Sequence, residues 1–287
     1  MSTSVTVDPG SGLRTDGGDD LDHLVLLAAL QDRFAAGVAA ADPGADVPAC
    51  APWTVRDLVL HVAQIHRWSA GQADPARGGS TSEAVPDDAT AVALAASYRD
   101  AAADLHATLV RIDPGASCRT LLGQGPASFW RRRQVHETLV HLHDLRTAIA
   151  PLDRADGSEG AESAESAEGA ERTDGADVLL LDDVRAEIWA DGVDEVVTMF
   201  QPRQVRLGRS APLARTVRLH AHDLDRSWTL GAHEDDRPSQ DPAATVRATA
   251  RTLDLLLWRR TTLADTDVEV SGDGATLHAV LAAPIVP

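Results

Sequence analysis

The chain has 287 residues, 44% of them hydrophobic, so it is long enough for one large domain or two ordinary ones with a buried core. Its formal net charge of −18 argues against a nucleic-acid partner, because proteins that bind a phosphate backbone normally carry a basic patch. We therefore expect two domains and no nucleic acid among the partners.

No membrane segment or secretory signal is expected. The best apolar run, from Leu24 to Leu30, is far shorter than the roughly 20 residues that cross a bilayer. The start of the chain has no basic stretch followed by an apolar one. We expect a cytoplasmic protein that is a monomer or a small homo-oligomer.

Apolar residues at helical spacing predict a bundle of long helices in residues 20–200, after a polar, glycine-rich tail at 1–19 that we expect to be disordered. Asp20 is the expected cap of the first helix, and Thr54 with Asp57 forms a capping box at the second. The five predicted helices cover residues 21–41, 54–68, 89–111, 128–149 and 178–200. Such helices joined by loops indicate an up-and-down bundle.

Two further segments depart from this pattern. Residues 151–177 are rich in Ala, Glu, Ser and Gly with hardly any large apolar residue, which predicts an acidic disordered loop within the bundle. Residues 201–287 predict a small α+β domain. Its expected elements are strands at 216–222, 226–231 and 268–270, a helix that opens at Pro242, and a final helix at 274–281.

The fourth predicted helix carries a possible metal site. Glu137 and His141 are four residues apart, so their side chains lie on one helix face about one turn apart. His61, on the second helix, supplies a third ligand if these two helices are neighbours. Two imidazoles and one carboxylate leave coordination positions open, as catalytic sites do. Asp144, on the same face, is expected to orient a ligand without binding the ion itself, or to pair with Arg133.

Other histidines fit this chemistry less well. His136, Glu137 and His141 look superficially like the HExxH motif, but two histidines five residues apart point about 140° away from each other on a helix. His66 and His143 are interpreted as surface or packing residues. The two cysteines, Cys50 and Cys118, are interpreted as thiols without a catalytic duty, so any thiol chemistry would need a thiol from another molecule.

The two motif-bearing segments match a family pattern. Residues 53–61 follow W-x-V-x-D-L-x-x-H, and residues 133–145 follow R-x-x-x-E-x-x-x-H-x-x-D-L. Residues 190–195 read A-D-G-x-D-E, and the last third of the chain carries a second likeness. Together they resemble the DinB-like maleylpyruvate isomerase family, mycothiol-dependent enzymes of actinobacteria. The acidic insertion departs from the family pattern, as does Arg259, where family members often have glycine.

The resemblance implies a DinB-like helical bundle followed by a sterol-carrier-like α+β domain. It implies zinc held by His61, Glu137 and His141, with mycothiol as the nucleophile that attacks a small electrophilic substrate. The reaction would be an isomerisation or an S-transfer. Because a guanidinium binds a carboxylate through two parallel hydrogen bonds, Arg226 and Arg260 are candidate catalytic residues for an anionic substrate.

Two other functions are also compatible with the sequence. In the first, the two histidines and the carboxylate bind Fe(II) or another ion for oxygen or hydrolytic chemistry. In the second, the C-terminal domain binds a small molecule, as in a resistance protein, and the bundle is a scaffold.

Overall fold

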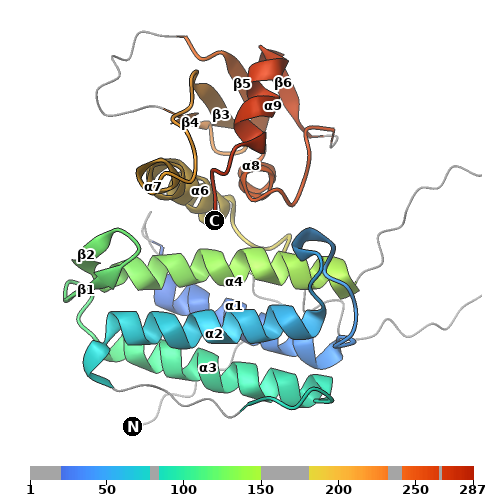
Figure 1. Cartoon of the computed structure of the whole chain (residues 1–287), viewed down its shortest axis with the longest axis vertical. Helices are drawn as coiled ribbons and strands as arrows, with labels where there is room; N and C mark the ends of the chain where they lie inside the picture. The colour runs from blue at the N-terminus through green and yellow to red at the C-terminus, as the bar shows by residue number, and fades with distance from the viewer. Residues whose placement is uncertain (1–20, 78–83, 150–180, 232–240, 265–266) are drawn as a thin grey trace, which may run out of the picture. The chain divides into compact units, whose positions relative to one another are not determined.

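The computed structural model of the chain describes residues 21–77, 84–149, 181–231, 241–264 and 267–287 (Figure 1). The described chain divides into two compact units, Asp22–Leu181 and Asp182–Pro287. The tail predicted at 1–19 and the acidic loop predicted at 151–177 lie outside the described residues.

The first unit is the predicted helical bundle. Its long helices are α1 (His23–Ala40), α2 (Val55–Ala73), α3 (Ala91–Arg111) and α4 (Ser128–Ile149). Both α1 and α2 pack against α3 and α4 (Figure 1). The two helices that carry the predicted metal ligands, α2 and α4, are therefore neighbours.

The ends of these helices follow from their capping residues. The Thr54 side chain accepts a hydrogen bond from the backbone of Asp57, and the Asp57 side chain accepts one from the backbone of Thr54, which confirms the predicted capping box of α2. The cap of α1 is Asp22, whose carboxylate accepts from the amides of Leu24 and Val25. Asp20 was the wrong choice because α1 begins at His23, two residues later than predicted.

Short elements connect the bundle helices. Two 3₁₀ turns, η1 (Pro48–Cys50) and η2 (Pro75–Arg77), flank α2. Between α3 and α4 the strands β1 (Ser117–Thr120) and β2 (Gly123–Pro126) form an antiparallel hairpin, where the Gly- and Pro-rich sequence predicted only a loop. The turn ends at Gly123, the first residue of β2, whose φ of 107° is a conformation that glycine adopts without steric cost.

Within the described residues, one helix, α1, is long and apolar enough to cross a membrane by length and composition. Eight of its residues are buried in the bundle, among them Leu26, Leu27, Leu30 and Phe34. The apolar residues of α1 thus supply part of the bundle core.

The second unit has the predicted α+β composition. Its sheet has the order β4-β3-β5-β6, in which β3 and β5 are parallel and the other pairs are antiparallel. The strands are β3 (Val217–Ala221), β4 (Arg226–Leu230), β5 (Ala244–Ala248) and β6 (Glu269–Gly272). The helices are α6 (Ala186–Glu195), α7 (Gln201–Arg206), α8 (Ala250–Leu257) and α9 (Gly274–Ala282), with a π-helical turn, η3 (Val196–Phe200), between α6 and α7.

The predicted boundary of the bundle at residue 200 differs from the observed division at Leu181 and Asp182. The fifth predicted helix corresponds to α6 and η3, and α6 packs against α8 of the second unit. Gly192 allows this close approach, because a Cβ there would lie 2.6 Å from a carboxylate oxygen of Asp254. The apolar face that suggested a bundle helix is thus buried within the C-terminal unit.

The helix predicted to open at Pro242 is also corrected. Residues 244–248 form β5, with Ala244, Val246 and Ala248 buried and the residues between them more exposed. Buried residues at every second position are typical of a strand with one buried face. The same short run of apolar residues is also compatible with a helix, which is why the sequence predicted one. The helix starts only at Ala250. Thr249 caps it, because its side chain accepts a hydrogen bond from the amide of Thr252.

Candidate metal centre

Helices α2 and α4 bring the three predicted ligands together. Oε1 of Glu137 lies 3.5 Å from Nε2 of His61 and 3.4 Å from Nε2 of His141. One donor atom from each of the three residues lies within 4.8 Å of the others. The condition on which the sequence prediction depended, that position 61 faces positions 137 and 141, is therefore met.

The histidine on α4 is held by a buried carboxylate. Asp144, which is fully buried, accepts a hydrogen bond at Oδ2 from Nδ1 of His141, over 2.9 Å. Because the carboxylate accepts a hydrogen bond from Nδ1, that nitrogen carries a proton, and Nε2 is the nitrogen that faces Glu137. Of the two roles considered for Asp144, the structure thus shows contact with the ligand, while Arg133 pairs with Glu137.

The carboxylate of Glu137 is held by a charged partner on the same helix. Arg133, one helical turn earlier and only 6% exposed, donates to Oε2. Burial alone would raise the pKa of Glu137, but the Arg133 guanidinium and hydrogen bonds from His141 and His61 hold it well below its ordinary value. Glu137 is therefore ionised, and its Oε1 faces the two imidazoles.

The charge of these carboxylates also acts on His141. Burial lowers the pKa of His141, but hydrogen bonds with Asp144, Cys50 and Glu137 outweigh burial and raise it well above its ordinary value. The site thus favours a positive charge next to Nε2 of His141. A proton and a metal cation meet the same electrostatic preference there.

The donor set fits a divalent cation such as Zn²⁺. Zinc binds imidazole nitrogen and carboxylate oxygen at about 2.0–2.1 Å, so neighbouring ligands of a tetrahedral ion lie roughly 3.3–3.4 Å apart. The two nitrogen–oxygen distances of 3.4 and 3.5 Å agree with that spacing. Three protein ligands would leave the fourth position of a tetrahedral ion open to a small molecule. The His61 side chain, 31% exposed, is the most exposed of the three.

Trp53 forms one wall beside this site. Its ring centroid lies 4.8 Å from that of His61, and the ring of His61 in turn lies 5.2 Å from that of His141 in an edge-on arrangement.

Two further histidines of the bundle, His66 and His136, lie outside this group of three donor atoms. His66 is fully buried and interacts with Gln134 over 2.8 Å and with the Tyr98 hydroxyl over 3.3 Å, as a packing residue would. His136 is buried on α4, but it does not belong to the group of donor atoms around Glu137. The HExxH reading stays rejected.

The two candidate catalytic arginines belong to the C-terminal unit. Arg226 is half exposed, lies 3.3 Å from Asp194, and stacks over the ring of Trp228. Arg260 donates to the backbone carbonyl of Trp258 over 2.7 Å. Their role toward an anionic substrate remains a prediction.

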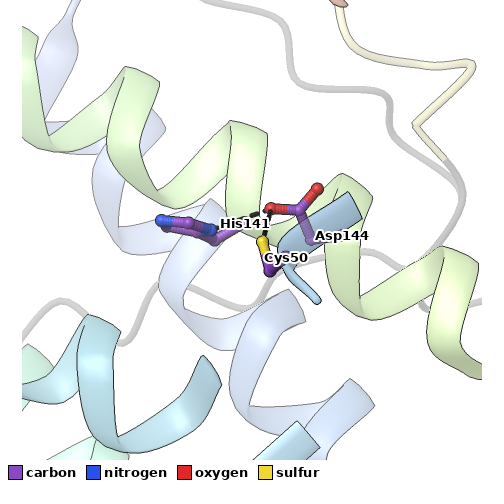
Figure 2. A group of neighbouring side chains, drawn as sticks. All are labelled: Cys50, His141 and Asp144. Carbon is purple, nitrogen blue, oxygen red and sulfur yellow. Dashed lines mark hydrogen bonds and ion pairs between the residues drawn. The ribbon is translucent and has the colours of Figure 1, made fainter. Parts of the chain in front are cut away.

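Sequence reasoning missed two neighbours of the ligands. Cys50, interpreted as a thiol without a duty, lies 3.3 Å from Oδ2 of Asp144 (Figure 2). Arg133 was considered as a partner of Asp144, although its spacing of four residues from Glu137 already indicated the observed pair. No local pattern announces Cys50, because its partner is 94 residues away in the chain.

Each of the two units contains a match to a domain model of the same protein family. Residues 26–146 match the model of the mycothiol maleylpyruvate isomerase N-terminal domain, and residues 187–279 match the MDMPI C-terminal domain. A search of the curated proteins found no match.

Two solved structures share the fold. The first, of the mycothiol-dependent maleylpyruvate isomerase, has a TM-score of 0.57 at 13% identity, with 87% of this chain and 92% of that chain covered. The second, of a histidine-to-alanine mutant of the mycothiol-dependent maleylpyruvate isomerase, has a TM-score of 0.54 at 13% identity, with 82% and 87% covered.

Proposed function

This chain belongs to the mycothiol maleylpyruvate isomerase family, and on that premise we propose that it is a zinc- and mycothiol-dependent isomerase or S-transferase acting on a small electrophile. The observation that carries the proposal is the convergence of His61, Glu137 and His141 on one point between α2 and α4. The same three residues are the ligands that the family resemblance implied.

The residues of the chain prepare the site before any ligand arrives. Asp144 holds Nδ1 of His141 in a hydrogen bond, so Nε2 is the nitrogen left for a cation, which would displace the proton there. Arg133 occupies Oε2 of Glu137, so Oε1 is the oxygen left for the cation. Both ligands on α4 are thus oriented by a partner on the same helix, at a spacing of three or four residues.

His61, Glu137 and His141 would hold a divalent cation, and its charge would lower the pKa of a thiol bound next to it, so that the thiolate would be available at neutral pH. This chemistry explains how a chain with two cysteines serves a thiol reaction, because the nucleophile comes from mycothiol. Attack of the thiolate on an electrophilic double bond would form a C–S bond and break the π bond. Rotation about the resulting single bond and expulsion of the thiolate would give the isomer, whereas uptake of a proton at the neighbouring carbon would give a stable thioether.

The test is to load the purified full chain with Zn²⁺ and incubate it with mycothiol and candidate electrophiles, beginning with maleylpyruvate. Chromatography follows isomerised product, and mass spectrometry detects S-conjugates. We expect conversion that requires both the metal and the thiol. His61→Ala removes one ligand and serves as the matched control, while a reaction without mycothiol serves as the thiol control.

The outcomes separate the alternatives. A chain that binds no Zn²⁺ contradicts the metal centre. Metal-dependent turnover without mycothiol favours oxygen or hydrolytic chemistry at the same site. Ligand binding that survives His61→Ala unchanged, with no turnover, favours a binding protein in which the bundle is a scaffold.

A further inference from the structure

One oxygen atom joins a thiol to the metal-binding histidine. Oδ2 of Asp144 lies 2.9 Å from Nδ1 of His141 and 3.3 Å from Sγ of Cys50 (Figure 2). Both neighbours are donors, because the neutral imidazole carries its proton at Nδ1 and the thiol carries its own. The Cys50 side chain, from η1, therefore contacts the carboxylate that orients a ligand on α4.

The loop that carries Cys50 is fixed by its own backbone. The amide of Cys50 donates to the carbonyl of Val47, the amide of Trp53 to that of Cys50, and the amide of Val47 to that of Trp53. Asp46 and Thr54 form an isolated β-bridge next to these bonds. Because Val47 is fully buried and η1 contacts α4, the loop holds the thiol at a defined place against Asp144.

We infer that Cys50 is a positioning residue for the metal ligand His141, acting through Asp144. The inference rests on the proposed metal centre. A buried carboxylate requires hydrogen-bond donors, and two donors that meet at one oxygen fix its side-chain rotamer. The fixed carboxylate in turn holds the ring of His141 so that Nε2 faces Glu137.

Cys50, His141 and Asp144 also form a group whose donor atoms lie within 4.8 Å, which raises the possibility of a cation among these three. Such a cation would take the lone pair of Nδ1, and this nitrogen is the one that Asp144 holds through a hydrogen bond. The positioning role leaves that bond intact and uses Nε2 for the cation, so we favour it. The experiment below distinguishes the two.

The experiment compares Cys50→Ala, Cys50→Ser and, as a matched control, Cys118→Ala in the full chain. Cys118 is a buried cysteine on β1, outside the groups of potential metal ligands. The Zn²⁺ dissociation constant is measured by chelator competition. Loss of a direct partner of a metal ligand costs about 10–100-fold in affinity, so the loss of this more distant donor in Cys50→Ala is expected to cost about threefold to tenfold.

Cys50→Ser restores a donor at the same place, so its Zn²⁺ affinity should lie close to that of the wild type. Cys118→Ala should match the wild type. Thermal unfolding with excess chelator shows whether Cys50→Ala damages the fold itself, and we expect the metal-free variants to unfold together with the metal-free wild type. Co²⁺ substitution then shows whether sulfur is bound to the ion.

Four results would overturn the inference. The first is equal Zn²⁺ affinity of wild type and Cys50→Ala, and the second is an equal loss of Zn²⁺ affinity in Cys50→Ala and Cys50→Ser. The third is a loss of stability in metal-free Cys50→Ala that is large enough to account for its reduced Zn²⁺ affinity. The fourth is a thiolate charge-transfer band in the Co²⁺ protein that Cys50→Ser lacks. A wild-type chain that binds no Zn²⁺ instead overturns the proposed metal centre and this inference with it.

Discussion

The substitution Glu137→Gln separates the two duties of the central carboxylate, ion-pair partner and metal ligand. Arg133 is 6% exposed and pairs with Glu137, so the neutral amide leaves a buried guanidinium without its ion-pair carboxylate. Breaking a buried ion pair from one side costs about 3–5 kcal/mol. Because glutamine keeps the shape and one oxygen acceptor, we expect a loss near the lower end, about 3 kcal/mol, in the metal-free protein.

Calorimetry in excess chelator measures this loss without the metal. For a unit of this size each kcal/mol corresponds to about 2–4 °C, so the melting temperature of the bundle should fall by roughly 6–12 °C. Zinc content, measured by elemental analysis of protein dialysed against Zn²⁺, should fall from about one ion per chain to near zero.

The double variant Arg133→Met/Glu137→Gln provides the control. It removes the buried guanidinium whose Glu137 carboxylate the single variant has lost, so stability should largely return while zinc binding does not. Full zinc content in Glu137→Gln would refute the carboxylate as a ligand. A double variant that melts as low as the single one would show that the stability loss comes from packing and not from an unpaired charge.

Two further predictions concern buried positions away from the ligands. Burial lowers the pKa of His66 to about 4. As the pH falls from about 6.5 to 4, the unfolded chain therefore binds a proton that the folded chain does not bind, and the folded state loses about 3 kcal/mol of stability. Denaturant titrations should show that the free energy of unfolding of His66→Asn depends less steeply on pH than that of the wild type, and an unchanged slope would contradict this. Gly192→Ala places a methyl group 2.6 Å from a carboxylate oxygen of Asp254 and should destabilise the fold by about 1–3 kcal/mol. Gly71→Ala on α2, where the new methyl group meets open space, should instead stabilise the fold by about 0.5–1 kcal/mol. Equal effects of the two substitutions in calorimetry would show that a small shift relieves the contact with Asp254.

Local patterns predicted the bundle because each long helix has its own apolar period, and α1, α2 and α3 each begin after a capping side chain. Thr54 and Asp57 fix the start of α2, and α4 runs from Ser128 to Ile149 as predicted. The metal ligands were accessible for the same reason, since Glu137 and His141 share a helix face. Only the pairing of α2 with α4 had to be assumed.

What the sequence did not predict depends on contacts between distant segments. Residues 244–248 are compatible with both a strand and a helix, and pairing with β3 and β6 decides for the strand. The partner of α6 was likewise open, because an apolar helix face does not specify which surface covers it. Gly192 was the one local hint, since a glycine in the middle of a helix often marks a close approach.

Helix α4 shows why the polar residues of the site are tolerated in a bundle core. Burying charged groups is costly unless each has a partner. Arg133 offsets Glu137 through Oε2, and His141 offsets Asp144 through Nδ1. Each of these bonds uses the atom that a cation between α2 and α4 does not need, so Oε1 of Glu137 and Nε2 of His141 are left facing Nε2 of His61. The pairs that make the helix stable as a core element are therefore the same pairs that orient its two ligands, and removal of either charged partner, Arg133 or Asp144, should change stability and metal affinity together.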